Sequence, residues 1–162
     1  MRRILNAMVV VGMGLALTHG AAAQLPQRPV MTLETVTRVA AAAEAEAVRN
    51  NWSVVIVVVD DGGHLVHLRR MDGAQLGSLA VAQEKAKTAV LFRRPTKAFA
   101  DAVVAGNTTL LRLTGVIPIE GGIPLLVAGQ VAGAVGVSGV TSAQDGQIAQ
   151  AGVSAFPASP GR

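Results

Sequence analysis

The 162-residue sequence predicts a single α+β domain. Two pairs of strand-like segments, each joined by a tight glycine-containing turn, indicate an antiparallel sheet, and segments with helical periodicity precede, separate and follow them. The composition agrees with a compact fold, because 51% of the residues are hydrophobic and only 15% are charged, whereas disordered chains combine low hydrophobicity with high charge. Aromatic residues make up 2% of the chain, so its core must consist of Ala, Val, Leu and Ile.

The first 23 residues are predicted to form a signal peptide. Arg2 and Arg3 supply a positive start, residues 4–17 are almost wholly apolar, and residues 21–23 offer small side chains for cleavage after Ala23. The apolar run is short for a membrane span, and an uncleaved anchor or a buried helix is the alternative interpretation. We therefore expect a periplasmic or secreted protein without stable membrane insertion, and the sequence leaves both the general and the twin-arginine export routes open.

Cleavage would change the charge of the chain. The full sequence carries 14 basic and 10 acidic residues, and the loss of Arg2 and Arg3 leaves a net charge of +2. The remaining basic residues are scattered, with no aromatic side chains between them, so the high isoelectric point does not indicate a nucleic-acid partner. Residues 24–31 contain two prolines and are predicted to be an extended leader, followed by a domain at 32–156 and a flexible tail at 157–162.

The first half of the domain is predicted to be a helix followed by a hairpin. Thr32 can cap a helix whose apolar residues recur every three or four positions up to Asn50. Residues 53–59 are dense in β-branched side chains, as is typical of a central strand with both faces covered. Residues 60–63, with the sequence Asp-Asp-Gly-Gly, favour a tight turn into a return strand at 64–70.

The second half of the domain is predicted to contain two helices, a second hairpin and a last helix. Helices are predicted over 79–92, where alanines line one side, and from Pro95 through Val104, followed by a loop at 115–122. Two strands, 125–128 and 131–137, then form a hairpin that turns at Gly129 and Gln130, and a last helix runs from Asp145 to about Val153.

The sequence lacks complete forms of several catalytic and metal-binding motifs, which reduces the number of functions it could have. The absence of Cys excludes disulfides, thiolate zinc sites, iron–sulfur clusters and a cysteine nucleophile. Gly133, Gly136 and Gly139 lack the spacing of a dinucleotide site, so close packing of a helix or another subunit against the backbone is the better interpretation. Residues 136–139 fall one residue short of a serine nucleophile elbow. His64 and His67, three apart on a predicted strand, point to opposite faces and cannot easily share a zinc ion.

A cluster of polar residues remains on the first hairpin, the loop after it and the next helix. Its members are His64, His67, Arg69, Arg70, Met71, Asp72, Lys85 and Lys87. Each has an ordinary explanation as part of a strand edge, a solvated helix face or a loop cap. Together they predict a cationic rim above an apolar floor, which suits a flat or elongated anionic small molecule better than bond-breaking chemistry. The sequence therefore favours a binding protein over an enzyme.

Ordered motifs in this region resemble those of the GlcG/HbpS family. The resemblance is carried by residues 59–66 (VDDGGHLV), 70–74 (RMDGA), 82–89, 121–124 (GGIP) and 133–139 (GAVGVSG), and it extends over about residues 33–153. It implies a profilin-like α+β domain with a five-stranded antiparallel sheet flanked by helices, in the order α-β-β-α-α-β-β(-β)-α. It also implies a homo-oligomer. Exported members of the family are associated with haem, a related domain with corrinoids, and other members with glycolate oxidation.

Haem is therefore the expected cofactor, although the resemblance does not dictate its ligand. His64 and His67 are the first candidates for binding the iron, Met71 is the next, and Thr114 is a distant one through its hydroxyl group. Arg70 and Lys85 are candidates to pair with the haem propionates. On a regular strand, each histidine would share a face with alternate residues: His64 with Val66 and Leu68, and His67 with Leu65 and Arg69.

Three functions follow as expectations. The first is an exported, oligomeric haem-binding protein that acts in haem sequestration or redox sensing. The second is an accessory protein or enzyme for a small hydroxycarboxylic acid, held by Arg70, Asp72 and Lys85, with corrinoid binding as a further variant. The third is a purely structural oligomer that packs through its Ala- and Gly-rich faces.

Overall fold

The computed structural model describes residues 27–157. The predicted signal peptide (1–23) and the end of the predicted tail (158–162) lie outside these residues. The elements, in chain order, are α1 (Leu33–Arg49), β1 (Val55–Asp60), β2 (Leu65–Arg70), α2 (Ser78–Leu91), α3 (Thr96–Val104), the 3-10 helix η1 (Thr108–Arg112), β3 (Gly122–Val127), β4 (Gln130–Ser138) and α4 (Ser142–Ser154). This order confirms the α+β class, both hairpins and the helices between and around them. Residues 27–31 adopt neither helix nor strand.

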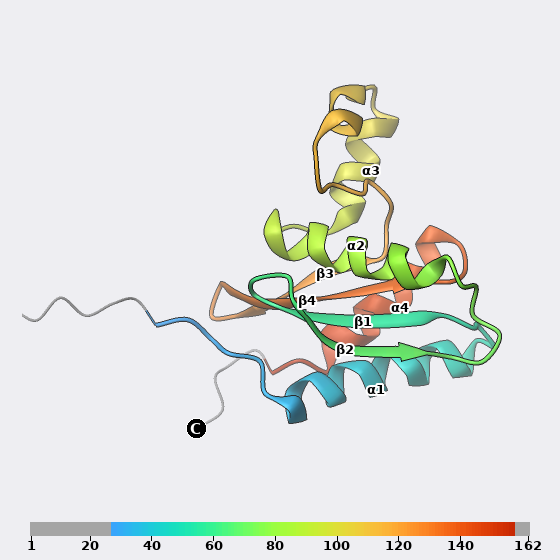
Figure 1. Ribbon diagram of the computed structural model, residues 1–162, viewed down its shortest axis with the longest axis vertical. Helices are drawn as coiled ribbons and strands as arrows, with labels where there is room; N and C mark the ends of the chain where they lie inside the picture. Colours follow the sequence, from blue (N-terminus) through green and yellow to red (C-terminus); the bar gives the residue numbers. More distant parts are fainter. Residues whose placement is uncertain (1–26, 158–162) are drawn as a thin grey trace, which may run out of the picture.

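The strands form one antiparallel sheet in the order β2-β1-β4-β3, which leaves β2 and β3 at its edges. The helices α1 and α4 pack together against one face of this sheet, and α2 covers the other face over β1, β3 and β4 (Figure 1). The fold therefore has three layers, with two helices on one face of the sheet and α2 on the other.

The expectation of a five-stranded sheet was wrong, because the described residues contain four strands. The segment before β3 does not extend the sheet. Ile119 donates a hydrogen bond to the carbonyl of Ile117 at 2.9 Å, which closes a tight turn, and Pro118 between them has no N–H to give to a ladder. The loop predicted at 115–122 is thus observed up to Gly121, and pairing begins at Gly122.

The central strand β1 supplies both halves of the core. Val54, just before β1, packs with Ile56 and Val58 toward α1 and α4, whereas Val55, Val57 and Val59 pack toward α2, and all six are buried. This alternation confirms the prediction of a strand with both faces covered. Burial of an aliphatic side chain of this size contributes about 1.5–3 kcal/mol, so β1 is the main organiser of the fold.

The glycines of β4 allow α2 to lie close to the sheet. A Cβ atom added to Gly136 would meet the carbonyl oxygen of Ala82 at 2.2 Å and the backbone nitrogen of Ala86 at 2.6 Å. The small face of α2 and the glycine of β4 therefore fit together only because neither carries a larger side chain. For Gly136, this supports the interpretation of the repeated glycines as a packing surface for a helix.

Helix boundaries follow their capping residues. Thr32 caps α1 by accepting a hydrogen bond from the Thr35 backbone at 3.2 Å, as predicted. The last helix begins earlier than expected, since Thr141 is its N-cap and forms a capping box with Gln144 in the first turn. Asp145 does not open that helix and is instead a buried residue of its first turns.

The segment from α3 through η1 forms an arm that projects from the body of the protein (Figure 1). Within α3 only Thr96 and Phe99 are buried, and η1 has no buried residue. Phe99 holds the base of the arm, because its ring lies 5.6 Å from that of Phe92 and 4.7 Å from the guanidinium carbon of Arg94. Most of the arm therefore depends on its own contacts.

Candidate functional site

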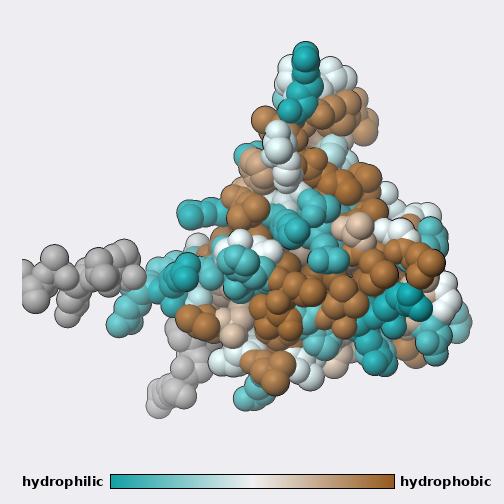
Figure 2. All heavy atoms as spheres, in the orientation of Figure 1, coloured by the Kyte–Doolittle hydropathy of each residue, from teal (hydrophilic) through white to brown (hydrophobic). Residues whose placement is uncertain are grey.

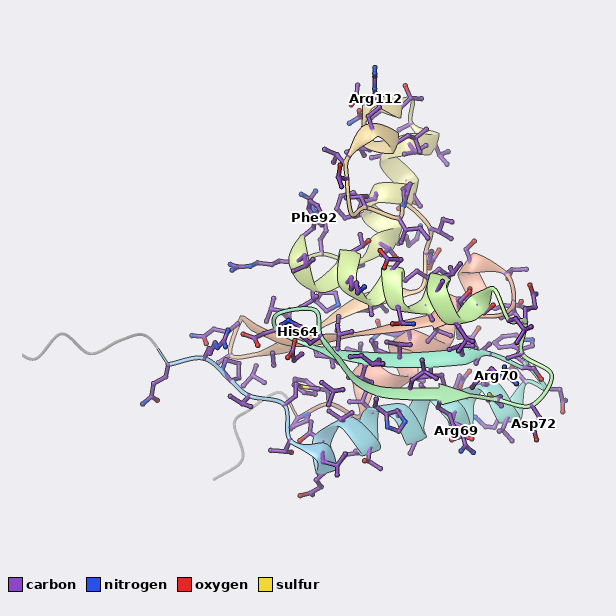
Figure 3. The ribbon with its side chains drawn as sticks, in the orientation of Figure 1. His64, Arg69, Arg70, Asp72, Phe92 and Arg112 are labelled. Carbon is purple, nitrogen blue, oxygen red and sulfur yellow. The ribbon has the colours of Figure 1, made fainter. Side chains whose placement is uncertain are left out.

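The cluster predicted from the sequence is divided between the two ends of β2. His64 lies in the turn before the strand, and Arg70, Met71 and Asp72 lie at or beyond its far end (Figure 3). His64 and Arg70 are six positions apart along the chain, which in a strand corresponds to a distance of about 20 Å. A small ligand therefore cannot contact His64 and Arg70 of the same chain at once. We call the turn at residues 60–64 the hairpin end of β2, and residues 69–72 its arginine end.

A β-bulge changes which residues share a face of β2. The pairing of β1 with β2 shifts between Val58, which lies opposite His67, and Val59, which lies opposite Leu65. His67 and Arg69 lie on the face that α1 covers, whereas Leu68 and Arg70 lie on the face toward α2. The expected alternation was wrong for His64, since this residue belongs to the turn and not to the strand. It was also wrong for Leu65, which the bulge places on the face opposite to that of His67.

Lys85 lies apart from both ends of β2, in the interior of the protein. Its side chain is 1% exposed, and its ammonium group donates to the Asp145 carboxylate at 2.7 Å and to the Val137 carbonyl at 3.0 Å. Asp145 is 3% exposed and also accepts a hydrogen bond from the Val140 backbone at 3.2 Å. Lys85 therefore ties α2 to α4 and to the inner strand β4, and it does not belong to the predicted cationic rim.

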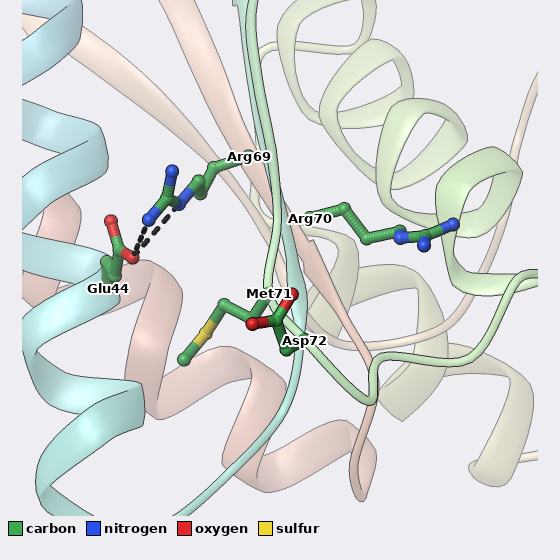
Figure 4. A pocket seen from close by; sticks show the side chains of 5 residues that line it. All are labelled: Glu44, Arg69, Arg70, Met71 and Asp72. Carbon is green, nitrogen blue, oxygen red and sulfur yellow. Dashed lines mark hydrogen bonds and ion pairs between the residues drawn. The ribbon is translucent and has the colours of Figure 1, made fainter.

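The arginine end carries a pocket of about 440 Å³ with balanced charge, lined by Glu44, Arg69, Arg70, Met71 and Asp72. Arg69 donates to Glu44 of α1 at 2.8 Å and 3.0 Å, which neutralises it (Figure 4). Arg70 points to the opposite side of the strand, and Met71 packs toward the core (Figure 4). We call this hollow the arginine pocket. Because its two guanidinium groups are matched by two carboxylates, it offers little net attraction to an anion.

The hairpin end holds a carboxylate–imidazole pair. The Nδ1 atom of His64 lies 3.2 Å from each carboxylate oxygen of Asp60, and the side chain of His64 is 81% exposed. An ionised carboxylate only accepts hydrogen bonds, so Nδ1 must carry the proton in this contact. In a neutral ring the lone pair then belongs to Nε2. A Cβ atom added at Gly62 would meet the imidazole at 2.7 Å, so a larger residue here would displace the ring from this position.

Asp60 is fixed in its ionised form by the turn around it. Its Oδ1 atom accepts hydrogen bonds from the backbone of His64 at 2.8 Å and of Gly62 at 2.9 Å. Burial alone would raise the pKa of Asp60, but these bonds and the contact with the His64 ring outweigh it and hold the pKa below its usual value of 3.8. The carboxylate is thus a stable support for the imidazole at neutral pH.

A second hollow of about 750 Å³ lies at the same end of the sheet. We call it the leader pocket; its lining residues are Gln27, Arg28, Pro29, Asp61, Val90, Arg93, Leu126, Gly129, Gln130 and Val131. Val90, Leu126 and Val131 supply apolar surface, and Arg28 and Arg93 supply positive charge. Arg28 lies 2.6 Å from Asp61, the neighbour of Asp60 in the hairpin turn. Because Asp61 belongs both to the lining and to the turn at residues 60–64, the leader pocket lies beside the turn that contains His64.

The other predicted residues lie away from these hollows. His67 is half-buried in the middle of β2 under α1, and Thr114 is exposed in the loop after η1. Lys87 is partly exposed on α2 and pairs with Glu84 at 3.1 Å. Within residues 27–157, no group of three His, Asp or Glu side chains is placed to hold a metal ion. None of the helices described is long and apolar enough to cross a membrane.

Comparison with known proteins identifies the family. Residues 31–154 match the family described as "Haem degrading protein HbpS-like". The chain belongs to this family. Among curated proteins, the HbpS-like chain is 45% identical over 109 residues to Protein GlcG of Escherichia coli K12, which covers 67% of this chain and 81% of that protein. This confirms the resemblance to the GlcG/HbpS family.

Solved structures of relatives share the fold of the HbpS-like chain. The crystal structure of HbpS aligns with a TM-score of 0.77 and 32% identity, covering 84% of this chain and 96% of that one. The crystal structure of a PduOC–haem complex aligns with a TM-score of 0.72 and 30% identity, covering 78% of this chain and 95% of that one. A structure of the Klebsiella pneumoniae protein ORFY gives a TM-score of 0.77 and 36% identity, with coverages of 83% and 96%.

Proposed function

We propose that this HbpS-like chain binds haem at the hairpin end of β2, with Nε2 of His64 as the ligand of the iron. The family description names haem, and a relative with the same fold has been solved in complex with haem. The observation that identifies His64 as the ligand is its contact with Asp60. Histidines that bind a metal usually donate their other ring N–H to a carboxylate, which fixes the tautomer and strengthens the ligand.

The two histidines within residues 27–157 differ in this respect. His64 is exposed and holds its free nitrogen away from Asp60, whereas His67 is half-buried under α1. A single axial ligand is sufficient for haem, so the absence of a three-residue metal cluster among residues 27–157 does not conflict with it. The donor set at the hairpin end therefore fits an iron porphyrin.

The leader pocket fits the rest of such a ligand. Its volume of about 750 Å³ lies within the range of about 300–1,000 Å³ that is usual for small-molecule sites. Val90, Leu126 and Val131 would contact the apolar porphyrin, and Arg28 and Arg93 would pair with its propionates. Bound haem would supply an iron centre for redox chemistry or for binding small molecules. The protein's own residues hold the ligand and orient His64.

The predicted signal peptide extends this proposal to the role of the protein. A haem-binding protein exported to the periplasm or beyond would sequester haem there or report on its redox state. The alternative of a small hydroxycarboxylic acid held by Arg70, Asp72 and Lys85 is less well supported. Lys85 is sealed in the core, and the arginine pocket contains Glu44 and Asp72 as well as its two arginines.

Haem titration of the purified protein tests the proposal through the Soret band. We expect a saturable spectrum for the unaltered protein and a loss of affinity of about 100-fold or more for His64→Ala, because the axial ligand is removed. His67→Ala, on the strand that follows the turn, is the matched control and should bind like the unaltered protein. Met71→Leu should also leave the spectrum unchanged.

Two results would contradict the proposal. Haem that binds no better than it does to an unrelated apolar protein would remove the function altogether. A loss of binding in His67→Ala or Met71→Leu, with binding retained in His64→Ala, would move the site away from the hairpin end.

A further inference from the structure

The helix α2 ends in a Schellman motif whose left-handed residue is Arg93. The Arg93 backbone donates to the Val90 carbonyl at 3.3 Å, and the Arg94 backbone donates to the Ala89 carbonyl at 3.2 Å. This motif requires a positive φ angle at the residue after the helix cap, and Arg93 has a φ of 54°. Glycine adopts such a conformation freely, whereas a Cβ atom makes it unfavourable. The chain therefore places a long side chain where the backbone favours glycine.

The same motif ends α1 and α3, and in both the left-handed residue is of a type that suits this conformation. Asn51 follows α1 with a φ of 55°, and Gly106 follows α3 with a φ of 98°. Glycine is the usual residue at this position, and asparagine is the next. Among these three equivalent positions, Arg93 is therefore the exception. The backbone hydrogen bonds that define the other two motifs run from Asn51 to Val48, from Trp52 to Ala47, from Gly106 to Val103 and from Asn107 to Ala102.

Arg93 also differs from the other two left-handed residues in its position, because it lines the leader pocket and they do not. The turn between β3 and β4 reaches the same pocket through Gly129, and this turn contains Ala128, a further non-glycine residue with a positive φ, of 48°. Strained backbone conformations of this kind cluster at functional sites. The strain at Arg93 therefore points to a use for its side chain in the pocket.

The guanidinium group of Arg93 is the charge that the leader pocket has available for a ligand. Arg28, the other cation of the lining, already pairs with Asp61 at 2.6 Å. Arg94 lies over the ring of Phe99 at the base of the arm. Arg93 takes part in none of the ion pairs found within residues 27–157. The pocket thus combines one unmatched positive charge with apolar surface, and Figure 2 shows hydrophilic and hydrophobic side chains side by side at the end of the body where the leader begins.

A favourable contact with the helix dipole does not by itself explain the arginine. A cationic side chain stabilises a helix from anywhere in its last turn. The helix α1 has Arg49 in its last turn and keeps Asn51 at the left-handed position, whereas the last turn of α2 holds no basic residue. A cation that served only the dipole of α2 could stand inside the helix, where the backbone is not strained.

We infer that Arg93 determines the specificity of the leader pocket for ligands that carry a carboxylate. Its left-handed backbone is retained because glycine or asparagine at this position would leave the pocket without an unpaired cation. The inference rests on the proposed function for the identity of the ligand, whose carboxylates are the haem propionates, but the comparison of the three motifs does not. Arginine binds a carboxylate through two parallel hydrogen bonds, which gives geometric selectivity as well as charge. Residue 93 therefore exchanges stability for selectivity.

Titration with haem and with haem dimethyl ester, in which both carboxylates are blocked, tests the selectivity. We expect Arg93→Gly and Arg93→Gln each to weaken the binding of haem about tenfold and to change the binding of the ester by less than about twofold, because only a free propionate can pair with the guanidinium group. Asn51→Arg is the matched control, since it puts the same side chain into the same motif outside the pocket, and its haem affinity should be unchanged. An equal loss for haem and ester, or unchanged haem affinity in both variants at position 93, overturns the inference.

Thermal unfolding tests whether stability is given up at this position. Arg93→Gly should have a midpoint about 3 °C above that of Arg93→Gln, since both lack the charge and only glycine relieves the left-handed backbone. Its midpoint should also be no lower than that of the unaltered protein. Asn51→Arg should lower the midpoint by about 2 °C, because it introduces the same unfavourable residue into α1. A midpoint of Arg93→Gly below that of the unaltered protein would mean that the arginine serves the fold, and this overturns the inference.

The two ligands also separate this inference from the proposed function. If the unaltered protein binds neither haem nor its ester better than an unrelated apolar protein does, the proposed function fails and the role of Arg93 fails with it. If the unaltered protein binds both with equal affinity, the proposed function stands, and only the selectivity for a carboxylate is overturned. Tighter binding of haem than of the ester, lost in Arg93→Gly and kept in Asn51→Arg, supports both.

Discussion

The Asp60–His64 and Lys85–Asp145 pairs join a carboxylate to a nitrogen group in opposite surroundings. In the first, His64 is 81% exposed and one nitrogen of its ring is turned to solvent. In the second, both side chains are buried, and the ammonium group donates hydrogen bonds to Asp145 and Val137 inside the protein. Burial makes the second pair part of the architecture, whereas exposure leaves the first able to bind a ligand. A charged residue in a predicted site is therefore informative only once its accessibility is known.

Replacing Lys85 with Met should have the largest effect on the free energy of unfolding. Removing one member of a buried ion pair leaves the other charge without a partner, at a cost of about 3–5 kcal/mol. Urea denaturation measures this change. Lys87→Met on the same helix is the matched control, and it should stay within about 0.5 kcal/mol because Lys87 is partly exposed. Equal effects of the two substitutions would show that burial does not distinguish the pairs.

Replacing Asp60 with Asn should affect ligand binding more than it affects folding. Loss of the carboxylate behind a metal-binding histidine usually lowers affinity by about 10–100-fold. Haem titration of Asp60→Asn, with the unfolding transition measured in parallel, separates the two effects. Asp61→Asn is the neighbouring control and should weaken binding less, because Asp61 contacts Arg28 and not the imidazole. Normal haem affinity in Asp60→Asn would mean that the pair does not orient the ligand.

Replacing Arg28 with Ala should have a small effect. The Arg28 side chain is largely exposed, and exposed ion pairs contribute about 0.2–1 kcal/mol, so we expect haem affinity to fall by at most about fivefold. The loss should shrink as salt concentration rises, because salt screens exposed charges. Arg38→Ala on α1 is a suitable control, as Arg38 pairs with Glu34 outside the leader pocket. An effect as large as that of Asp60→Asn would place Arg28 much closer to the ligand.

The smallest expected effect is the contribution of Asp60 to the pH dependence of the free energy of unfolding. The pKa of Asp60 is lower in the folded protein than its usual value of 3.8, so the unfolded chain binds more protons in the interval between them. The stabilisation is complete above the unfolded value and is lost as pH falls through the folded one. The difference in unfolding free energy between the unaltered protein and Asp60→Asn should therefore be constant above about pH 5 and shrink in more acidic solution. A difference that grows on acidification would contradict the sign of the shift.

Local patterns predicted most of the elements because the forces that form them are local. The valine run of β1, the cap at Thr32 and the two hairpin turns were all visible in the sequence. The turn between β3 and β4 was placed one residue late, since Ala128 and Gly129 adopt positive φ angles and Gln130 already belongs to β4. The number of strands was wrong, because it came from the family resemblance and not from the turn at Pro118.

The candidate site was harder to predict because it depends on contacts between distant residues. The bulge that separates Leu65 from the face of His67 arises from pairing with β1, and no local signal marks it. The burial of Lys85 did have a signal, since Lys85 lies on the same side of its helix as Ala82, Ala86 and Ala89. A lysine on an apolar helix face predicts a buried partner, but its partner Asp145 lies 60 residues away in the sequence.

The projecting arm from α3 to η1 should unfold locally more easily than the rest of the protein. Because only Thr96 and Phe99 of α3 are buried and η1 buries nothing, the arm shares little of the core's cooperativity. Its amide protons should exchange with solvent through local fluctuations, at rates that are insensitive to mild denaturant. Those of β1 should exchange only through global unfolding. A protease that cleaves between α3 and η1 should therefore leave a nicked protein whose sheet, and whose hairpin end of β2, are still folded.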